Sequence, residues 1–269
     1  MKNKIIIFAL AVMSALLIVG GFVYKNNFYK KDTVKTIENV QNEKAATSTE
    51  VSTEKISRME DITSWYEAKI EYPKDNELIK TRIFDAYSDF AKETKILDYK
   101  NDKEAREGLA LFEGMKYSFN ADFTKSTSTI MVAGKELKTE TYIYQIYTFS
   151  GGAHGSLDIN PITIREDGVE VKNEEILPDT ALKNIAKIAY SKVMKQRIEK
   201  LKGAGLSAAD IKQIITDVSW TKEGTDPVRD NYSRVGLRGN NIVVYFGQYQ
   251  VGSYAEGTYE VEIPRSEIK

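Results

Sequence analysis

The chain of 269 residues contains no cysteine and only one histidine, His154. Without cysteine there is no disulfide, no thiolate zinc site, no cysteine nucleophile and no lipid-modified cysteine. A single imidazole also excludes every metal site that needs two or three histidines. We therefore expect neither a metal ion nor a cofactor.

The chain also lacks an excess of positive charge once the N-terminus is set aside. The first 31 residues hold five lysines and no acidic residue, and the rest holds 33 basic against 39 acidic side chains, a net charge of −6. Nucleic-acid binding needs clustered positive charge, so the composition argues against a nucleic-acid partner. A mildly acidic body would tolerate or favour a cationic partner.

One long apolar run is present, Ile5 to Tyr24, with lysines at both ends. A helix of this length spans the roughly 30 Å hydrocarbon core of a membrane. We expect residues 1–25 to form an uncleaved membrane anchor. The alternative is a signal peptide, although the cleavage-site candidate Val19-Gly20-Gly21 is poor. The first reading predicts a single-pass membrane protein with an extracytoplasmic body, the second a secreted or periplasmic one.

The segment that follows, residues 26–55, is rich in Lys, Glu, Thr, Ser and Asn. Such a composition buries too little apolar surface to offset the entropy of ordering the chain. We expect a disordered linker, and a short helix that continues from the membrane is the alternative.

The remainder, from Ile56 onwards, reads as an α+β fold with antiparallel sheets and helices on one face. Residues 65–72 alternate as in a strand, and apolar residues at three- and four-residue spacing predict a helix over 78–97. From Lys116 the period changes to two, which predicts antiparallel strands up to Phe149. The last of these strands has large side chains on both faces, so we expect it to be central in its sheet.

The second half begins with strands over residues 158–164 and 169–171, and a helix is predicted over 180–202. A polar loop over 224–234, a hairpin and a final strand over 258–263 complete the pattern. We divide the body into an N-terminal lobe, 56–155, and a C-terminal lobe, 156–269. The sequence leaves open whether these are separate domains or share one sheet; we expect two lobes that pack together.

The only histidine lies in a glycine-rich turn, Ser150-Gly151-Gly152-Ala153-His154-Gly155. As a general base, His154 would need a nucleophile and an orienting carboxylate, for which Ser150, Ser156 and Asp158 are the nearby residues. No established serine-enzyme pattern and no metal-ligand spacing accompanies them. Glycines indicate positive φ angles or close chain approach, so the better interpretation is a histidine that pins a turn between the lobes.

A second marked stretch, Tyr245 to Gly257, is rich in tyrosine and glycine. Exposed tyrosines in a loop suit recognition of a protein or a sugar. The same residues would equally suit the packed corner between two strands. The sequence does not decide between these interpretations.

These two stretches resemble a known bacterial domain family of mostly unknown function. Two motifs carry the resemblance. The first is Gly151-Gly152-Ala153-His154-Gly155, and the second, about 90 residues later, is Phe246-x-x-Tyr249-x-Val251-x-x-Tyr254-Ala255-x-Gly257, followed by Val261-x-Ile263-Pro264. The pattern is similar to the extracytoplasmic domain pair of the anti-sigma factor RsiV and to the non-catalytic part of the peptidoglycan deacetylase PdaC. The likeness spans residues 62–269. Ser253 stands where the family often has proline.

The resemblance implies an α+β module on the outer side of a bacterial membrane, and in the RsiV branch it implies lysozyme binding. We expect no anti-sigma segment and no deacetylase domain in this chain. The expected function is a membrane-anchored binding or sensing module of the cell envelope, without catalysis, that recognises lysozyme or peptidoglycan. The candidate binding residues are His154, Gly151, Gly152, Tyr249 and Tyr254. The alternative is an envelope hydrolase that uses His154.

Overall fold

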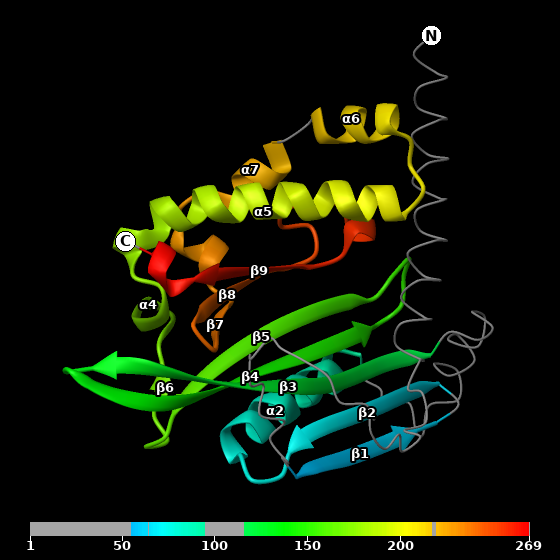
Figure 1. The fold of residues 1–269 in the computed structure, drawn as a ribbon. Coiled ribbons are helices and arrows are strands. Elements are labelled where there is room, and N and C mark those ends of the chain that lie inside the picture. Colours follow the sequence, from blue (N-terminus) through cyan, green and yellow to red (C-terminus); the bar gives the residue numbers. More distant parts are fainter. Residues whose placement is uncertain (1–54, 64, 95–115, 217–218, 269) are drawn as a thin grey trace, which may run out of the picture.

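The computed structural model describes residues 55–63, 65–94, 116–216 and 219–268, which form two sheets and their covering helices (Figure 1). The predicted anchor at 1–25 and nearly all of the predicted linker at 26–55 lie outside the described residues. Within them, no helix is both long and apolar enough to cross a membrane.

The larger sheet has six strands whose spatial order follows the chain. They are β1 (Ile56–Ile62), β2 (Tyr66–Pro73), β3 (Tyr117–Val132), β4 (Lys135–Phe149), β5 (Ser156–Arg165) and β6 (Glu170–Val171). All neighbours are antiparallel except β2 and β3, which run parallel. The predicted purely antiparallel sheet is therefore wrong at this one pair. A parallel pair needs a crossover connection, and the connection here contains the helix α2 (Glu77–Glu93).

The predicted amphipathic helix is α2, which starts at the cap Asn76 and covers one face of this sheet. Its apolar stripe packs against alternate residues of the strands, among them Tyr142, Tyr144 and Ile146 of β4. The intervening Ile143 packs on the opposite face. Successive side chains of a strand point to opposite faces, so both faces of β4 are covered. The prediction that this strand is central is confirmed.

The smaller sheet has three antiparallel strands, β7 (Val235–Arg238), β8 (Asn241–Phe246) and β9 (Tyr259–Pro264). Its outer face is covered by α5 (Leu182–Gly203), the long helix predicted over 180–202. Of three shorter helices, α4 (Asn173–Ile176) lies against β7, whereas α6 (Ala208–Thr216) and α7 (Ser219–Thr225) lie against α5. The segment 224–234, predicted as a polar loop, contains the last two residues of α7 and the 3-10 turn Arg229–Tyr232.

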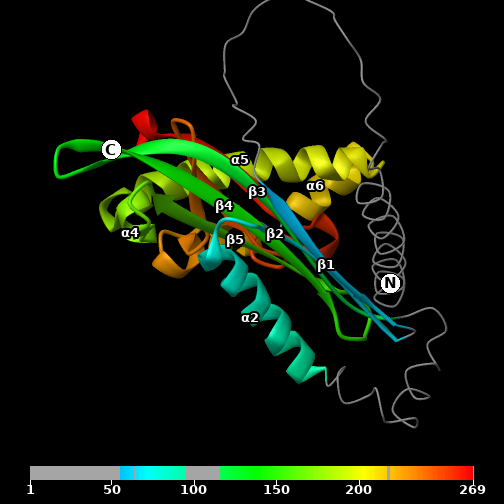
Figure 2. The same cartoon turned by 90° about the horizontal axis from the view of Figure 1, so that it is seen from below.

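The inner faces of the two sheets meet, so the helices α2 and α5 lie on the two outsides of the molecule (Figure 2). The contact consists of Ile143 and Ile159 from the larger sheet and Val243 and Tyr245 from β8. A Cβ on Gly236 of β7 would lie 2.8 Å from a side-chain methyl of Thr141, so glycine permits this close approach. Among the described residues, each sheet thus has a helix on its outer face and the other sheet on its inner face.

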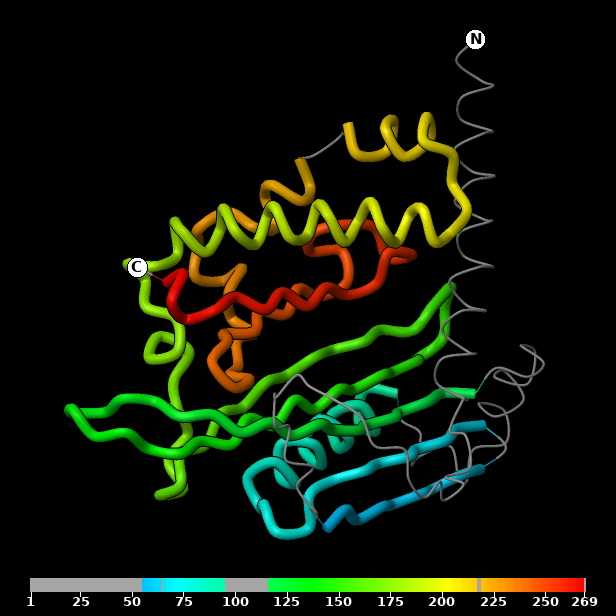
Figure 3. Tube along the Cα trace, viewed as in Figure 1, coloured from blue at the N-terminus to red at the C-terminus, as the bar shows by residue number. Residues whose placement is uncertain are grey.

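The boundary that we predicted between residues 155 and 156 does not coincide with a change of sheet. β4 and β5, on either side of it, pair along ten residues from Thr139↔Arg165 to Thr148↔Ser156. The chain leaves the larger sheet only after β6. It ends beside the start of α5 (Figure 3), where the Asn184 amide donates to Glu267 O at 2.7 Å.

Candidate ligand-binding site

A cleft of about 550 Å³ lies where the glycine-rich turn (residues 150–155) meets the loop between β8 and β9 (residues 247–258, the β8–β9 loop). Its lining is largely polar. The turn supplies Ser150 and His154, β5 supplies Asp158, and the loop supplies Tyr249 and Tyr254. The cleft therefore combines residues that lie about 95 positions apart in the chain.

The glycines give the turn its shape. Gly151 and Gly152 have φ angles of +95° and +94°, which side-chain-bearing residues rarely adopt. A Cβ on Gly155 would lie 2.4 Å from the ring of Tyr147, so this position also requires glycine. The prediction of positive φ angles and close approach is confirmed. Gly151 and Gly152 do not line the cleft, and their effect on it is through the path of the turn.

His154 connects the turn to the β8–β9 loop. Its Nδ1 lies 3.1 Å from Gly155 O, and its Nε2 lies 3.1 Å from the hydroxyl of Tyr249. Its ring stacks on Tyr254 with centroids 3.7 Å apart and planes inclined by 20°. A carbonyl can only accept, so in the neutral ring Nδ1 carries the proton and Nε2 accepts from the tyrosine. Three of the five predicted binding residues thus touch one another.

This environment differs from that of a catalytic histidine. Both ring nitrogens of His154 face uncharged oxygens, and the nearby carboxylate Asp158 instead binds Arg234 Nη2 at 3.0 Å and the Asn160 amide at 2.9 Å. A general base of the triad type needs an orienting carboxylate. In the part of the chain that the structure describes, no three His, Asp or Glu side chains cluster as ligands for a metal ion.

Trp220 of α7, which was not among the predicted binding residues, adds a fourth ring to those of His154, Tyr249 and Tyr254. Its indole lies 6.1 Å from the Tyr249 ring, nearly parallel at 17°, and its Nε1 donates to Tyr249 O. Trp220 is 41% exposed and Tyr249 48%, so both residues are accessible to solvent. The only local signal was a tryptophan among polar neighbours, because its proximity to Tyr249 is set by the docking of α7.

Tyr249 has a backbone conformation that tyrosine rarely adopts, with φ at +65°. It stands third in a turn closed by a hydrogen bond from Gln250 N to Gly247 O at 3.2 Å, a position where glycine is usual. Such conformations persist where the surroundings impose them, and they are concentrated at functional sites. In this conformation the ring of Tyr249 lies beside that of Trp220.

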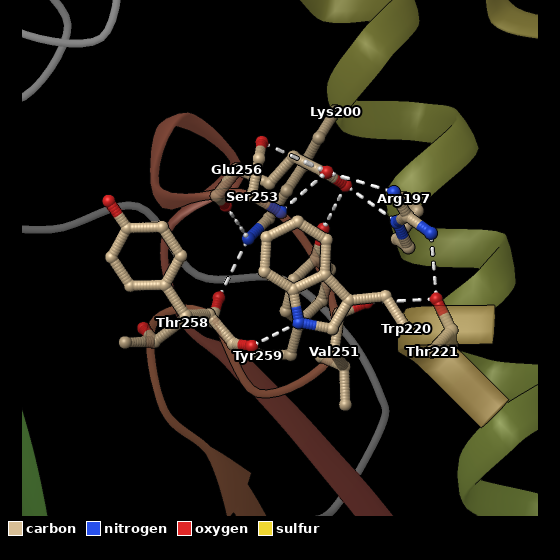
Figure 4. Close-up of polar contacts among 10 residues, drawn as sticks. Arg197, Lys200, Trp220, Thr221, Val251, Ser253, Glu256, Thr258 and Tyr259 are labelled. Atoms are coloured by element: carbon tan, nitrogen blue, oxygen red, sulfur yellow. Dashed lines mark hydrogen bonds and ion pairs between the residues drawn. The ribbon is translucent and has the colours of Figure 1, made fainter. Parts of the chain in front are cut away.

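The β8–β9 loop is attached to α5 by a buried ion pair between Arg197 and Glu256 (Figure 4). Arg197 Nε lies 2.6 Å from Glu256 Oε2, and Nη1 donates to the Thr221 hydroxyl of α7 at 2.7 Å. Thr221 in turn donates to Val251 O at 2.8 Å. Lys200 donates to two backbone carbonyls of the loop, and the loop is thereby fixed to two helices.

The ionisation of this pair follows from its surroundings. Burial is the largest single effect and disfavours the charged guanidinium, but the hydrogen bond to Glu256, the negative charge of Glu256 and the contact with Tyr259 together outweigh it and raise the pKa of Arg197. Burial alone would raise the pKa of Glu256. Hydrogen bonds from Arg197, the Ser253 N–H and the Tyr259 hydroxyl outweigh this effect and lower the pKa of Glu256 below its ordinary value. Both groups are therefore charged at neutral pH.

Comparison with known proteins shows that the C-terminal part of the chain is similar to a described family. Residues 174–266 match the family described as "Protein of unknown function (DUF3298)". The whole chain is similar to peptidoglycan-N-acetylmuramic acid deacetylase PdaC of Bacillus subtilis (strain 168), with 23% identity over 270 residues. That match covers 96% of this chain and 49% of the deacetylase, so the chain spans about half the length of this curated relative. The predicted resemblance is confirmed.

Two solved structures of DUF3298 family proteins are also similar to this chain. One is from Pseudomonas aeruginosa PAO1, with a TM-score of 0.42, and covers 80% of this chain and 93% of its own. The other is from Bacteroides fragilis NCTC 9343, with a TM-score of 0.47, and covers 80% of this chain and 91% of its own. Both are 12% identical in sequence.

Proposed function

We propose that this chain is a non-catalytic binding module of the bacterial cell envelope, whose cleft takes a saccharide unit of the cell wall. The observation that carries the proposal is the exposed pair of Trp220 and Tyr249 beside a polar cleft. Small-molecule sites are typically concave and combine aromatic faces with a few placed polar groups.

A saccharide fits this surface chemically. A pyranose ring has an apolar face of C–H bonds, which can lie on the exposed face of Tyr249 or Trp220. Its hydroxyl and acetamido groups need donors and acceptors at the edge of the ring. The cleft offers both, because Asp158 accepts, Arg234 donates, and Gln248 does both.

The rigidity of the site supports a binding role. The loop that carries Tyr249 is tied to α5 and α7 through Arg197, Glu256 and Thr221 before any ligand arrives. Fixing a binding surface in advance lowers the entropic cost of association. The strained backbone of Tyr249 agrees with this, because it is maintained at a cost to folding.

The relative named as a peptidoglycan-N-acetylmuramic acid deacetylase supports the choice of the cell wall as partner. We propose that the described body lies outside the cytoplasm, either anchored by residues 5–24 or released by cleavage. The apolar run with flanking lysines supports this placement. The expected exclusion of nucleic acid is part of the same proposal.

The proposal is tested by titrating the full-length chain with soluble peptidoglycan fragments in a calorimeter. We expect Trp220→Ala to weaken binding at least tenfold, because it removes one stacking face. The matched control is Tyr190→Ala, an aromatic residue on α5; unlike Trp220 it is not stacked on the lining residue Tyr249, so its loss should leave the affinity unchanged. No heat of binding from the unaltered chain, or equal effects of both substitutions, would refute the proposal.

Lysozyme is the second candidate ligand. Tryptophan and tyrosine dominate the energetics of protein interfaces, and here both are exposed side by side. The same titration with lysozyme separates the two ligands. Lysozyme binding that Trp220→Ala abolishes, without any saccharide binding, would favour the protein partner.

The hydrolase alternative is tested with His154→Ala. Peptidoglycan fragments incubated with the unaltered chain should stay intact by mass spectrometry. Turnover that disappears with His154→Ala while the melting temperature stays unchanged would establish catalysis and refute the binding module.

A further inference from the structure

The two sheets have four edge strands between them, β1 and β6 in the larger sheet and β7 and β9 in the smaller one. Other described residues hydrogen-bond to the edges of β7 and β9, and β6 is very short. Along β9, carbonyls accept from α5: Lys192 donates to Glu262 O at 2.5 Å and Gln196 donates to Glu260 O at 2.7 Å. Unpaired edges invite pairing with another chain, and proteins usually cover them. The helix α5 does this for β9.

The edge of β7 is satisfied by the larger sheet. Leu237 O accepts from the Ser126 hydroxyl at 2.7 Å, and Leu237 N donates to the Thr141 hydroxyl at 3.2 Å. At the far edge of the larger sheet, β6 has only two residues, too few to serve as a template. The remaining edge is β1, with seven residues.

The alternation of hydrogen bonds shows which groups of β1 point outwards. Lys74 N donates to Lys55 O, and Thr63 N donates to Tyr66 O, so the odd-numbered residues bond to β2. In an antiparallel ladder the intervening residues direct their N–H and C=O groups away from that partner. The four such residues are Ile56, Arg58, Glu60 and Ile62. No other described residue hydrogen-bonds to these backbone groups.

We propose that β1 pairs antiparallel with β1 of a second copy of this chain, with Met59 on the two-fold axis. This register places Arg58 opposite Glu60 of the other copy, and Ile56 opposite Ile62. All four belong to the set with outward-pointing backbone groups, so each facing pair can exchange two hydrogen bonds. Among the registers that pair these outward-pointing groups, this one also places opposite charges and two isoleucines across from each other.

The side chains of these four residues lie on the same face of the strand, the more exposed one. Ile56 is 51% exposed and Ile62 is 50% exposed, which is unusual for isoleucine in a strand. Opposite charges and apolar pairs directly across an antiparallel ladder stabilise it. The two-fold symmetry repeats each favourable pair, as expected of an isologous interface.

The self-complementarity of β1 selects a second copy over an unrelated strand. The backbone edge alone would accept any extended peptide. A second copy of β1 supplies the facing Arg58–Glu60 and Ile56–Ile62 pairs twice each, on the two sides of the axis. β1 also lacks the lysine and proline residues with which many proteins block an edge. The pairing would join two larger sheets into one continuous sheet.

Because the chain contains no cysteine, one introduced thiol reports on the register without interference. In the proposed dimer the two Met59 residues form a non-hydrogen-bonded pair, with Cα atoms about 4.5 Å apart, which suits a disulfide. We expect full-length Met59→Cys to form a disulfide-linked dimer under mild oxidation. The matched control, Met131→Cys, is 66% exposed near the tip of the β3–β4 hairpin and should stay monomeric on a non-reducing gel.

Charge reversal tests the facing pairs. Arg58→Glu and Glu60→Arg should each weaken dimerisation by light scattering about tenfold or more, because like charges then face each other. The double variant restores opposite charges and should dimerise again. Arg58 also pairs with Glu71 of its own chain, but the double variant shares that loss, so a recovery reports on the facing copy alone.

The proposal is overturned if the unaltered chain is monomeric at micromolar concentrations, or if the double variant is no better than the single ones. It is also overturned if Met59→Cys cross-links no faster than Met131→Cys. Thermal unfolding of each variant checks whether the fold is retained. These residues do not line the cleft, so the outcome is independent of the proposed saccharide binding.

Discussion

Arg197 and Glu256 form an ion pair in which both side chains are nearly inaccessible, with 4% and 7% of their surface exposed. The pair joins the middle of α5 to the β8–β9 loop. Because charged groups are costly to bury singly, each depends on the other and on hydrogen bonds to Thr221, Ser253 and Tyr259. The aromatic surface at the cleft therefore rests on a buried charge network.

Removing one member of the pair should strongly destabilise the protein. We expect Arg197→Ala to lower the free energy of unfolding by about 3–5 kcal/mol, because Glu256 is left charged and buried. Urea unfolding measures the change. The control is Lys92→Ala, which removes the exposed pair with Asp89 and should cost less than about 1 kcal/mol. Equal losses would show that burial of the pair is unimportant.

Stability should also decline at acid pH because of Glu256. Its pKa in the folded protein lies below that in the unfolded chain, where a glutamate titrates near about 4.3. As the pH falls, the glutamate of the unfolded chain is therefore protonated before that of the folded protein. The stabilisation by Glu256 is complete above the unfolded pKa and is lost as the pH falls through the folded pKa. Glu256→Gln should be less stable at pH 7 and lose less between about pH 5 and pH 3. Parallel curves for the two proteins would contradict this.

The positive φ of Tyr249 predicts an unusual order among substitutions. Tyr249→Ala keeps the strained backbone and loses the contacts with Trp220 and His154, whereas Tyr249→Gly loses the same contacts but relieves the strain. We expect the glycine variant to be more stable than the alanine variant by about 1 kcal/mol, by thermal or urea unfolding. Both should lose saccharide binding. An alanine variant as stable as the glycine variant would refute the strain.

The β3–β4 hairpin offers a stabilising substitution far from the cleft. Ala133 and Gly134 connect Val132 to Lys135 with φ angles of 49° and 79°, the type I′ geometry that favours Asn-Gly. Ala133→Asn should raise the free energy of unfolding by about 0.5–1 kcal/mol, since asparagine tolerates positive φ better than alanine. Ala133→Val is the opposing control and should lower it. A urea series on the three proteins decides the matter.

The elements that sequence predicted well are those fixed by local chemistry. The spacing of apolar residues predicted α2, and the glycines predicted the turn around His154. The large side chains on both faces of the strand that contains Ile143 predicted that this strand is central in its sheet. In each case the periodicity or the φ preference belongs to the segment itself. His154 and Tyr254 were both candidate binding residues, but the stacking of their rings was not predicted.

What sequence did not predict depends on contacts between distant segments. The parallel pairing of β2 and β3 joins segments about 50 residues apart in the chain, Tyr66–Ile70 and Tyr117–Ala121. Trp220 belongs to the site because Gly224 of the same helix permits close approach to the β8–β9 loop, where a Cβ would lie 1.9 Å from Gln250 O. No sequence pattern within α7 or within the β8–β9 loop predicts this close approach.

The contact between His154 and Tyr249 has a consequence for how occupancy of the cleft can be detected. One residue follows a strand of the larger sheet and the other follows a strand of the smaller sheet, so the cleft exists only while the sheets are docked. A ligand there binds the native state and not the undocked or unfolded chain. At a hundredfold excess over its Kd it would add about 2.7 kcal/mol to stability, so a thermal-shift screen of wall fragments reads binding directly.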